Sequence, residues 1–181
     1  MKITRTEIPE VLLLEPRVFD DARGLAFESY NRRTFNEATG LTVEFVQDNR
    51  SVSKRNVIRG LHYQIGCPQG KLIGALRGQI YDVAVDLRRH SPTFGKWVGF
   101  TLSETDRRMA WIPRGFAHGF LALSAVAEVL YKLDEFWSPQ HERTILWDDA
   151  QIGVRWPLEA EPILSDKDRR GVPLRSAEIF D

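Results

Sequence analysis

Cysteine is almost absent from this chain. A single cysteine, Cys67, stands among 181 residues, which excludes an internal disulfide and any metal site built from several thiolates. Long hydrophobic runs are absent too. The N-terminus offers only VLLL at 11–14, which is far too short for a signal-peptide core or a membrane span. We therefore expect a soluble, cytoplasmic protein.

Neither sign of charge dominates the sequence. The chain has 25 basic and 25 acidic residues, so no net field favours DNA or an anionic membrane as a partner. Internal repeats, low-complexity tracts and polar linkers are absent as well. The length is that of one large domain, and we expect a single domain over residues 1–181.

Helical signals are scarce. The best candidate is 32–39, where Asn31 can cap the first turn and Gly40 can end the helix. The tail beyond Trp156 has no clear pattern, and we expect it to be mostly irregular.

Strand signals, in contrast, recur along the chain. Residues 79–88 alternate, so that Tyr81 and Val83 lie on one face of a strand and Asp82 and Ala84 on the other. Many short strands with few helices indicate a sandwich or a closed barrel. Further strands are expected at 41–46, 97–102, 108–112, 120–123 and 129–133.

Four histidines are the first candidates for chemistry. His62 and His118 stand among aromatic residues and glycines, whereas His90 and His141 have polar neighbours that favour a solvated surface role. A lone histidine in an apolar setting is more often structural than catalytic. For His62 the residues alone leave both alternatives open.

The neighbours of these histidines disfavour a metal site. Metal-binding barrels of the cupin type commonly use a His-x-His pair, a nearby glutamate and a further histidine. Here Gln64 stands two residues after His62, and Lys71 stands where an acidic ligand is needed. An amide supplies no imidazole and an ammonium repels a divalent ion, so His118 lacks enough partners. We expect neither a metal nor a cofactor.

The remaining set indicates acid–base chemistry on an anionic substrate. Arg59 and Lys71 place two cations near His62 in the sequence, and an arginine can grip a phosphate with two hydrogen bonds. Taken alone, Lys71 fits a surface salt bridge equally well. Asp82 interrupts an apolar strand, and an inward carboxylate needs a partner such as an imidazole.

A series of short motifs, taken in order, resembles the dTDP-4-dehydrorhamnose 3,5-epimerase family. The motifs are FVQDN (45–49), RGLHYQ (59–64), QGK (69–71), YDVAVD (81–86), SPTFGKW (91–97), WIPRGFAHGF (111–120), YK (131–132), WDD (147–149) and ILSDKD (163–168). The match runs in register from about residue 3 to residue 175. The resemblance implies a mainly β fold, namely a cupin-type jelly-roll barrel with a few short helices and an irregular C-terminal tail.

The resemblance also implies a reaction. The family inverts C3 and C5 of dTDP-4-dehydro-6-deoxy-D-glucose, and both carbons lie α to the C4 ketone. The chemistry therefore needs a base on one face, an acid on the other and charge stabilisation at O4. The resemblance assigns His62 as the base and Tyr131 as the acid. It assigns Asp168 as the carboxylate that orients the imidazole, and Lys71 as the cation near O4.

Substrate-binding residues and a partner follow from the same resemblance. The binding residues are Arg23, Glu28, Gln47, Asp48, Asn49, Arg59, His118, Trp137, Glu142 and Lys167. Among them Trp137 would stack on the thymine ring, while Asp82 would sit behind His118. The family is similar to a homodimer in which an N-terminal segment crosses to the partner, so some binding residues act across the interface. Nucleic acid and membrane are not expected partners.

The sequence departs from the family pattern in two places. Phe136 and Trp137 stand where tyrosines are common: the tryptophan keeps a stacking face, but the phenylalanine lacks a hydroxyl. Gly74 replaces a frequent arginine and so removes a cation. Three alternatives stay open: an epimerase acting at C3 only, a non-catalytic barrel that binds nucleotide sugars, and a metal-dependent oxygenase.

Overall fold

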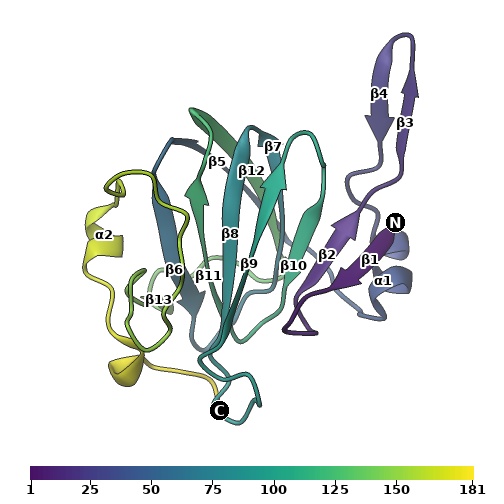
Figure 1. The fold of residues 1–181 in the computed structure, drawn as a ribbon. Helices are drawn as coiled ribbons and strands as arrows, with labels where there is room; N and C mark the ends of the chain where they lie inside the picture. The colour runs from purple at the N-terminus through teal and green to yellow at the C-terminus, as the bar shows by residue number, and fades with distance from the viewer.

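Two antiparallel sheets face each other in the computed structural model, which describes residues 1–181 (Figure 1). The six-stranded sheet has the order β1-β2-β10-β7-β12-β5, and the five-stranded sheet has the order β13-β6-β11-β8-β9. A separate hairpin, β3–β4, projects away from both sheets (Figure 1). This mainly β architecture confirms the cupin-type jelly-roll barrel expected from the sequence.

The bounds of the elements are as follows. The six-stranded sheet contains β1 (Lys2–Arg5), β2 (Leu12–Glu15), β10 (Met109–Ile112), β7 (Lys71–Arg77), β12 (Val126–Leu133) and β5 (Gln47–Lys54). The five-stranded sheet contains β13 (Glu142–Thr144), β6 (Ile58–Gln64), β11 (Phe116–Ala122), β8 (Gln79–Asp86) and β9 (Trp97–Ser103). The hairpin is β3 (Val18–Asp21) with β4 (Gly24–Phe27), and the helices are α1 (Arg32–Thr39), α2 (Asp166–Arg169) and a 3-10 turn (Leu174–Ser176). None of these helices is long and apolar enough to cross a bilayer.

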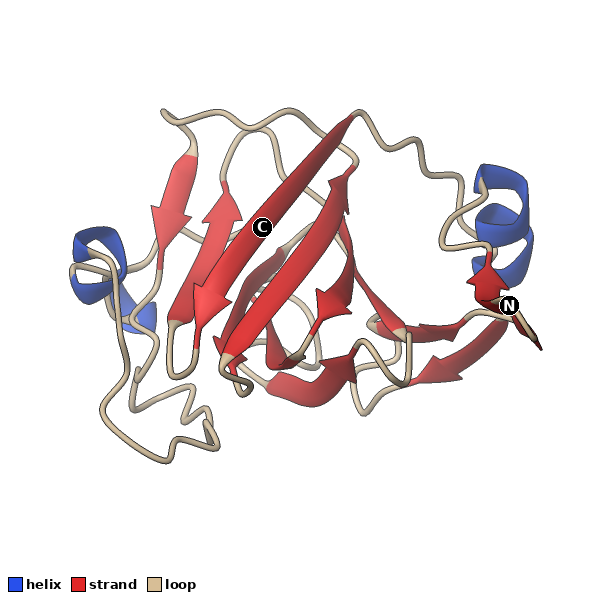
Figure 2. Cartoon of the chain, turned by 90° about the horizontal axis from the view of Figure 1, so that it is seen from above, coloured by secondary structure: helices blue, strands red, loops and turns tan.

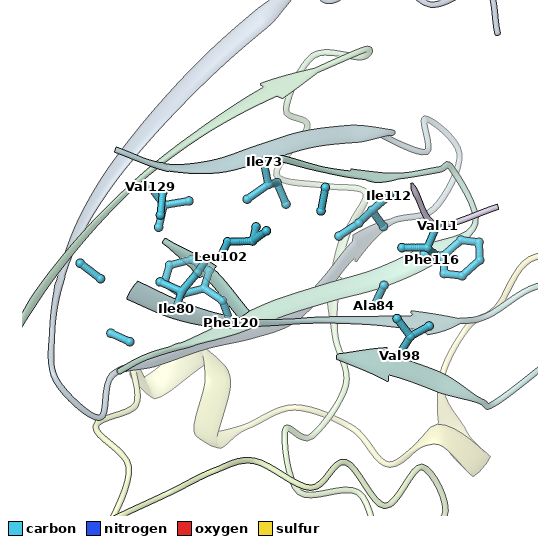
Figure 3. Packing of buried hydrophobic residues seen from close by; sticks show 14 of the residues in the cluster. Val11, Ile73, Ile80, Ala84, Val98, Leu102, Ile112, Phe116, Phe120 and Val129 are labelled. Carbon is cyan, nitrogen blue, oxygen red and sulfur yellow. The ribbon is translucent and has the colours of Figure 1, made fainter. Parts of the chain in front are cut away.

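Strand β8 has the alternation predicted for 79–88. Ile80 and Ala84 are fully buried in the cluster that lies between the two sheets, which also contains Ile73 of β7 on the opposite side (Figure 3). Val83, one position out of phase, belongs instead to a cluster on the outer face of the five-stranded sheet. Each large apolar side chain buried this way contributes about 1.5–3 kcal/mol of transfer free energy. The strand is therefore fixed in register by burial on both faces.

The C-terminal tail covers that outer face. It is mostly irregular, as the sequence predicts, and its Leu174 and Phe180 pack against the cluster that contains Val83. The Tyr63 hydroxyl on β6 donates to the Glu178 carbonyl at 2.6 Å. Helix α2, in the middle of the tail, lies beside β6 (Figure 1). Residues more than a hundred positions apart are thereby brought together.

Helix α1 has the bounds that the sequence predicts. The Asn31 side chain accepts a hydrogen bond from the Thr34 N–H at 3.2 Å, and Gly40 ends the helix with a φ of 72°. That backbone conformation suits glycine because a Cβ would be strained there. The buried Phe35 anchors the helix on the outer face of the six-stranded sheet. Figure 2 shows α1 and α2 at opposite ends of the barrel.

The strand expected at 41–46 is wrong. Only Val46 at its end bonds a strand, donating its N–H to the Leu133 carbonyl of β12 at 2.8 Å. Nearer α1, the Leu41 N–H donates to Thr39 Oγ1 and the Val43 N–H to Asn36 Oδ1, both at 3.3 Å. Its alternation reflects packing all the same, since Val43 faces the apolar cluster under α1. The apolar alternation therefore indicates a buried face here and not a hydrogen-bonded strand.

The other expected strands are present with shifted ends. Residues 97–102, 108–112 and 129–133 fall in β9, β10 and β12, whereas 120–123 covers only the end of β11. Strands β5, β6 and β7 carry polar or mixed sequences that conceal their strand character. Their polar side chains do not point to solvent alone but line a cavity between the sheets.

Candidate active site

A cavity of about 440 Å³ opens between the two sheets, next to the apolar cluster. Phe120 of β11 belongs to both, so that the packed core forms one boundary of the cavity. Most of the predicted site residues line it: His62, Tyr131, Asp168, Lys71, Gln47, Asn49, Arg59, His118, Trp137, Glu142 and Lys167. They come from β5, β6, β7, β11, β12 and β13, from the loop after β12 and from the tail.

His62 is held by a carboxylate from the tail. Its Nε2 lies 2.5 Å from Asp168 Oδ1, a separation of 106 residues in sequence. The second oxygen of Asp168 accepts from the Ser165 hydroxyl at 2.7 Å, and the same hydroxyl accepts from the Asp168 N–H at 3.1 Å. Ser165 also caps α2, so the same hydroxyl caps the helix and fixes the position of the Asp168 carboxylate.

Asp168 is buried yet ionised. Burial alone would raise the pKa of its carboxyl, but hydrogen bonds from His62 and Ser165 together hold that pKa below its ordinary range. A carboxylate in this place fixes the ring tautomer, because the bonded Nε2 must carry the hydrogen. It also stabilises an imidazolium once the ring has taken a proton.

A second histidine–carboxylate pair lies on the neighbouring strands. His118 of β11 is directly opposite His62 in the pairing of β11 with β6. Its Nε2 lies 2.9 Å from Oδ2 of Asp82, which is fully buried. The partner expected for the inward carboxylate of β8 is therefore this imidazole, as the strand alternation and the motif register predict.

Tyr131 enters the cavity from the other wall. It lies on β12 of the six-stranded sheet, while His62 lies on β6 of the five-stranded sheet. Burial raises the pKa of its phenol above the ordinary value, with the positive charge of Arg59 and the nearby Ser51 opposing that rise. The phenol is therefore neutral at pH 7 and can donate a proton.

Lys71 carries the buried cation of the site. It begins β7 with a side chain that is almost inaccessible to solvent. Burial lowers the pKa of its ammonium to about 8, although the carboxylates of Asp134 and Glu142 favour the charged form. A cation in such a setting interacts strongly with negative charge that develops nearby.

The rim of the cavity carries the remaining polar groups. Glu142 Oε1 lies 3.0 Å from Lys167 Nζ and 3.4 Å from the indole nitrogen of Trp137. Arg59 is held at the strand by its Nε donating to Ser53 Oγ at 2.9 Å. An exposed indole face, an arginine and a carboxylate around one opening suit a ligand with an aromatic ring, phosphates and hydroxyls.

Three of the predicted binding residues lie outside this cavity. Asp48 points to the outer face of β5, where its carboxylate accepts from Lys132 Nζ at 2.7 Å. Arg23 is at the tip of the β3–β4 hairpin and pairs with Asp21, while Glu28 follows the hairpin and accepts from the Asn31 amide. Within one chain these three side chains do not meet the catalytic candidates.

Gly74 also lies away from the cavity. It faces outward from β7 against Met109. It lines a separate hollow between the six-stranded sheet and residues 25–30. The missing arginine at this position therefore does not change the wall that holds His62. Phe136, the other departure, is exposed beside Trp137.

Some cavity residues were not identified from the sequence as part of the site. They are Tyr63, Gln64, Gln69, Phe120, Leu133 and Ser165. Gln64 could have been found, because it shares the face of β6 with His62 two residues away. Ser165 had a signal too, as a serine three residues before Asp168 at the start of a short helix.

Comparison with known proteins identifies the family. The family model described as dTDP-4-dehydrorhamnose 3,5-epimerase matches residues 5–176. The chain belongs to this family. The dTDP-4-dehydrorhamnose 3,5-epimerase of Pseudomonas aeruginosa is 58% identical over 180 residues, 99% of each chain. The structure of the dTDP-6-deoxy-D-glucose-3,5-epimerase of Legionella pneumophila, in complex with dTDP-4-keto-L-rhamnose, has a TM-score of 0.96 at 45% identity and covers 98% of this chain and 94% of that one.

A more distant relative bears on the alternatives. A 3'-monoepimerase from Streptomyces bikiniensis, in complex with dTDP-quinovose, has a TM-score of 0.89 at 31% identity and covers 97% of this chain and 88% of that one. The barrel is thus common to both kinds of epimerase, and the fold alone does not separate them. Sequence identity favours the 3,5-epimerase over the C3-only, non-catalytic and oxygenase alternatives.

Proposed function

We propose that this epimerase inverts C3 and C5 of dTDP-4-dehydro-6-deoxy-D-glucose to give dTDP-4-dehydro-L-rhamnose, with His62 as base and Tyr131 as acid. One observation carries the assignment of roles: an imidazole and a phenol face the same cavity from opposite sheets. Inversion of a carbon requires removal of a proton from one face and its return on the other. Groups on opposite walls meet that requirement without moving the sugar between steps.

The steps follow from the bonding around His62. With Nε2 bonded to Asp168, the other ring nitrogen is the acceptor for the proton on the carbon next to the ketone. The electron pair of the broken C–H bond moves to the C4 oxygen as an enolate. Tyr131 then gives its proton to the carbon from the far side, and the tyrosinate is reprotonated from solvent while the imidazolium releases its proton. The same sequence at the second carbon completes the reaction.

Lys71 stabilises the enolate. Its ammonium lies in the same cavity, and a buried cation lowers the energy of an oxyanion more than an exposed one does. Asp82 orients a second imidazole, that of His118, in the wall beside the base. This imidazole is suited to a hydrogen bond with the sugar. These roles need no metal or cofactor.

The nucleotide is held at the rim. We assign the thymine ring to Trp137, whose indole is about half exposed at the mouth of the cavity, and the diphosphate to Arg59. Gln47, Asn49, Glu142 and Lys167 line the same opening and can bind hydroxyls and base edges. Asp48 is assigned to this group by family resemblance alone.

Arg23 and Glu28 are assigned to the site of a partner subunit. The hairpin that precedes Glu28 projects from the barrel (Figure 1). It exposes the large apolar side chains of Phe19 and Leu25. Such exposure in a monomer is typical of a surface that a second chain covers. We therefore propose a homodimer in which this N-terminal segment reaches the partner's cavity. The cytoplasmic location stays a prediction.

Two variants test the roles of the base and the acid. His62→Ala removes the proposed base, so both product formation and exchange of substrate protons with deuterated water should fall about 10³-fold. Tyr131→Phe should abolish product formation equally but retain exchange, because His62 can take a proton and return a deuteron on the same face. Both should bind dTDP within several-fold of the unmodified protein, as measured by calorimetry. Normal turnover in either variant would contradict the assigned roles.

A further inference from the structure

The loop after β12 carries Trp137 without the support of regular structure. Residues 134–138 belong to neither a helix nor a strand, and only Asp134 continues the pairing of β12 with β7, through its N–H to the Gly70 carbonyl at 3.2 Å. Unpaired backbone groups at a partly buried site are costly, and their partners decide where such a loop lies. Trp137 as a whole residue is 53% exposed, so its packing does not fix the loop.

One buried glutamine holds both sides of Trp137. Gln64 lies on β6, two residues beyond His62, with 2% of its surface exposed. Its Nε2 donates to the Phe136 carbonyl at 3.2 Å, and its Oε1 accepts from the Ser138 N–H at 2.7 Å. The same Nε2 donates to the Cys67 carbonyl at 2.8 Å, which ties the amide to its own hairpin. Apart from a 3.5 Å contact of Nε2 with the Cys67 sulfur, this amide bonds main-chain groups.

Two further glutamines hold the neighbouring residues of the loop. Oε1 of Gln47, at the start of β5, accepts from the Trp137 N–H at 2.9 Å. Nε2 of Gln69, just before β7, donates to the Glu135 carbonyl at 2.8 Å. Side-chain amides therefore replace the missing strand partner along the loop. Gln64 is the most buried of them and the only one with bonds on both sides of the tryptophan.

We propose that Gln64 is a positioning residue for recognition of the nucleotide base. Its amide holds the loop so that the Trp137 ring stands at the mouth of the cavity before the ligand arrives, which lowers the entropy cost of binding. The inference rests on the proposed function, in which Trp137 stacks on the base. It adds that the strand carrying the catalytic base also sets the position of the stacking platform.

Gln64→Met tests the proposal, because methionine keeps the length of the side chain and removes the amide. The expected result is a dTDP dissociation constant about tenfold higher by calorimetry, and a similar rise in KM for the nucleotide sugar. The value of kcat should stay within about threefold, since His62 and Tyr131 keep their own partners. Gln140→Met is the matched control: this glutamine is exposed in the same region, makes no side-chain hydrogen bond and should bind dTDP normally.

A double-mutant cycle separates positioning from a general structural effect. In a Trp137→Ala background the platform is gone, so Gln64→Met should change the dTDP affinity by less than about twofold. Equal losses in the two backgrounds would overturn the proposal, as would an unchanged affinity in Gln64→Met alone. A loss of kcat at constant KM would overturn it too.

The milder variant Gln69→Met keeps the test decisive if Gln64→Met does not fold. It removes one bond to the same loop and should raise the dTDP dissociation constant about threefold, again only when Trp137 is present. Failure of the proposed function looks different from failure of this inference. In the first case the unmodified protein does not bind dTDP, whereas in the second Trp137→Ala weakens binding and the glutamine variants do not.

Discussion

At the scale of single residues, the site combines groups whose ionisation is set by their surroundings. Asp168 stays ionised despite burial because His62 and Ser165 donate to it, whereas burial keeps the Tyr131 phenol protonated. Lys71 differs from both. Its pKa of about 8 places its loss of charge within an accessible range of pH.

The charge of Lys71 predicts an alkaline limit to activity. Its folded-state pKa is lowered, so the ammonium is present below about pH 8 and is lost as the pH rises through that value. If the ammonium stabilises the enolate, kcat/KM should be level near pH 7 and fall above pH 8. Lys71→Gln should lower kcat/KM about 10²-fold at pH 7 and remove the fall near pH 8.

The control for this profile is Lys96→Gln, which removes an exposed lysine far from the cavity and should leave the profile unchanged. A fall near pH 8 that persists in Lys71→Gln would show that another group sets the limit. Rates are best measured under kcat/KM conditions, because these report the ionisation of the free enzyme.

The sequence predicted the position of a side chain where the alternation within a single strand determines it. The alternation in 79–88 placed Asp82 inward, and its imidazole partner is present. Gln64 shows what a sequence cannot reveal: from the sequence, its amide indicates only that a metal ligand is missing at this position. Its partners are backbone groups of Phe136 and Ser138, more than seventy residues away, which no local pattern reveals.

At the scale of elements, the short helix α2 connects the tail to the catalytic strand. Ser165 caps the helix and donates to Asp168, so the cap and the His62 contact depend on each other. The charged run that precedes Arg169 is thus not a solvated linker. Asp168 is the buried residue of this run, and its contact with His62 holds a segment too polar for a core against β6.

Removing the cap should therefore affect catalysis as well as stability. Ser165→Ala should cost about 1 kcal/mol of helix stabilisation and lower kcat about tenfold, because Asp168 loses a fixing hydrogen bond. Thermal unfolding and kcat together measure the two effects, and Ser165→Thr should restore most of both. The matched control Ser176→Ala lies in the same tail without a side-chain hydrogen bond and should change neither. Unaltered kcat in Ser165→Ala would sink the connection.

Element-scale prediction depended on what each strand buries. Helix α1 was predicted to the residue because its cap and its glycine are local signals. The segment 41–46 was assigned wrongly as a strand, because apolar alternation also fits an extended segment that packs against a helix. Strands β5 and β6 were not predicted, since a cavity wall is polar where a core strand is apolar. Strand β7 combines the cavity-lining Lys71 with the core residues Ile73 and Ala75.

At the scale of the whole molecule, the barrel contains a packed core and a separate cavity. One region between the sheets is filled by apolar side chains (Figure 3). The adjoining region is an open cavity lined mainly by polar side chains. The β3–β4 hairpin contributes to neither within a single chain. The homodimer proposed above, with exchanged N-terminal segments, would give the hairpin a role.

Hybrid dimers test this exchange. Arg23→Ala should raise KM about tenfold, comparable to the loss of one charge-assisted hydrogen bond to phosphate. Coexpressed Arg23→Ala and His62→Ala chains should form hybrids that contain one intact cavity, with His62 from one chain and Arg23 from its partner. The purified hybrid should then show about half the kcat/KM of the unmodified dimer. Absence of this recovery would indicate that Arg23 serves the cavity of its own chain or none.

In the proposed reaction, one His62–Tyr131 pair inverts two carbons. The most direct measurement is proton NMR of dTDP-4-dehydro-6-deoxy-D-glucose incubated with the protein in deuterated water. Each inversion replaces a carbon-bound proton by a deuteron from solvent, because the acid that reprotonates the carbon has exchanged its own proton. Deuterium at both C3 and C5 of the product is the predicted result. Deuterium at C3 alone, or at neither carbon, would contradict the claim.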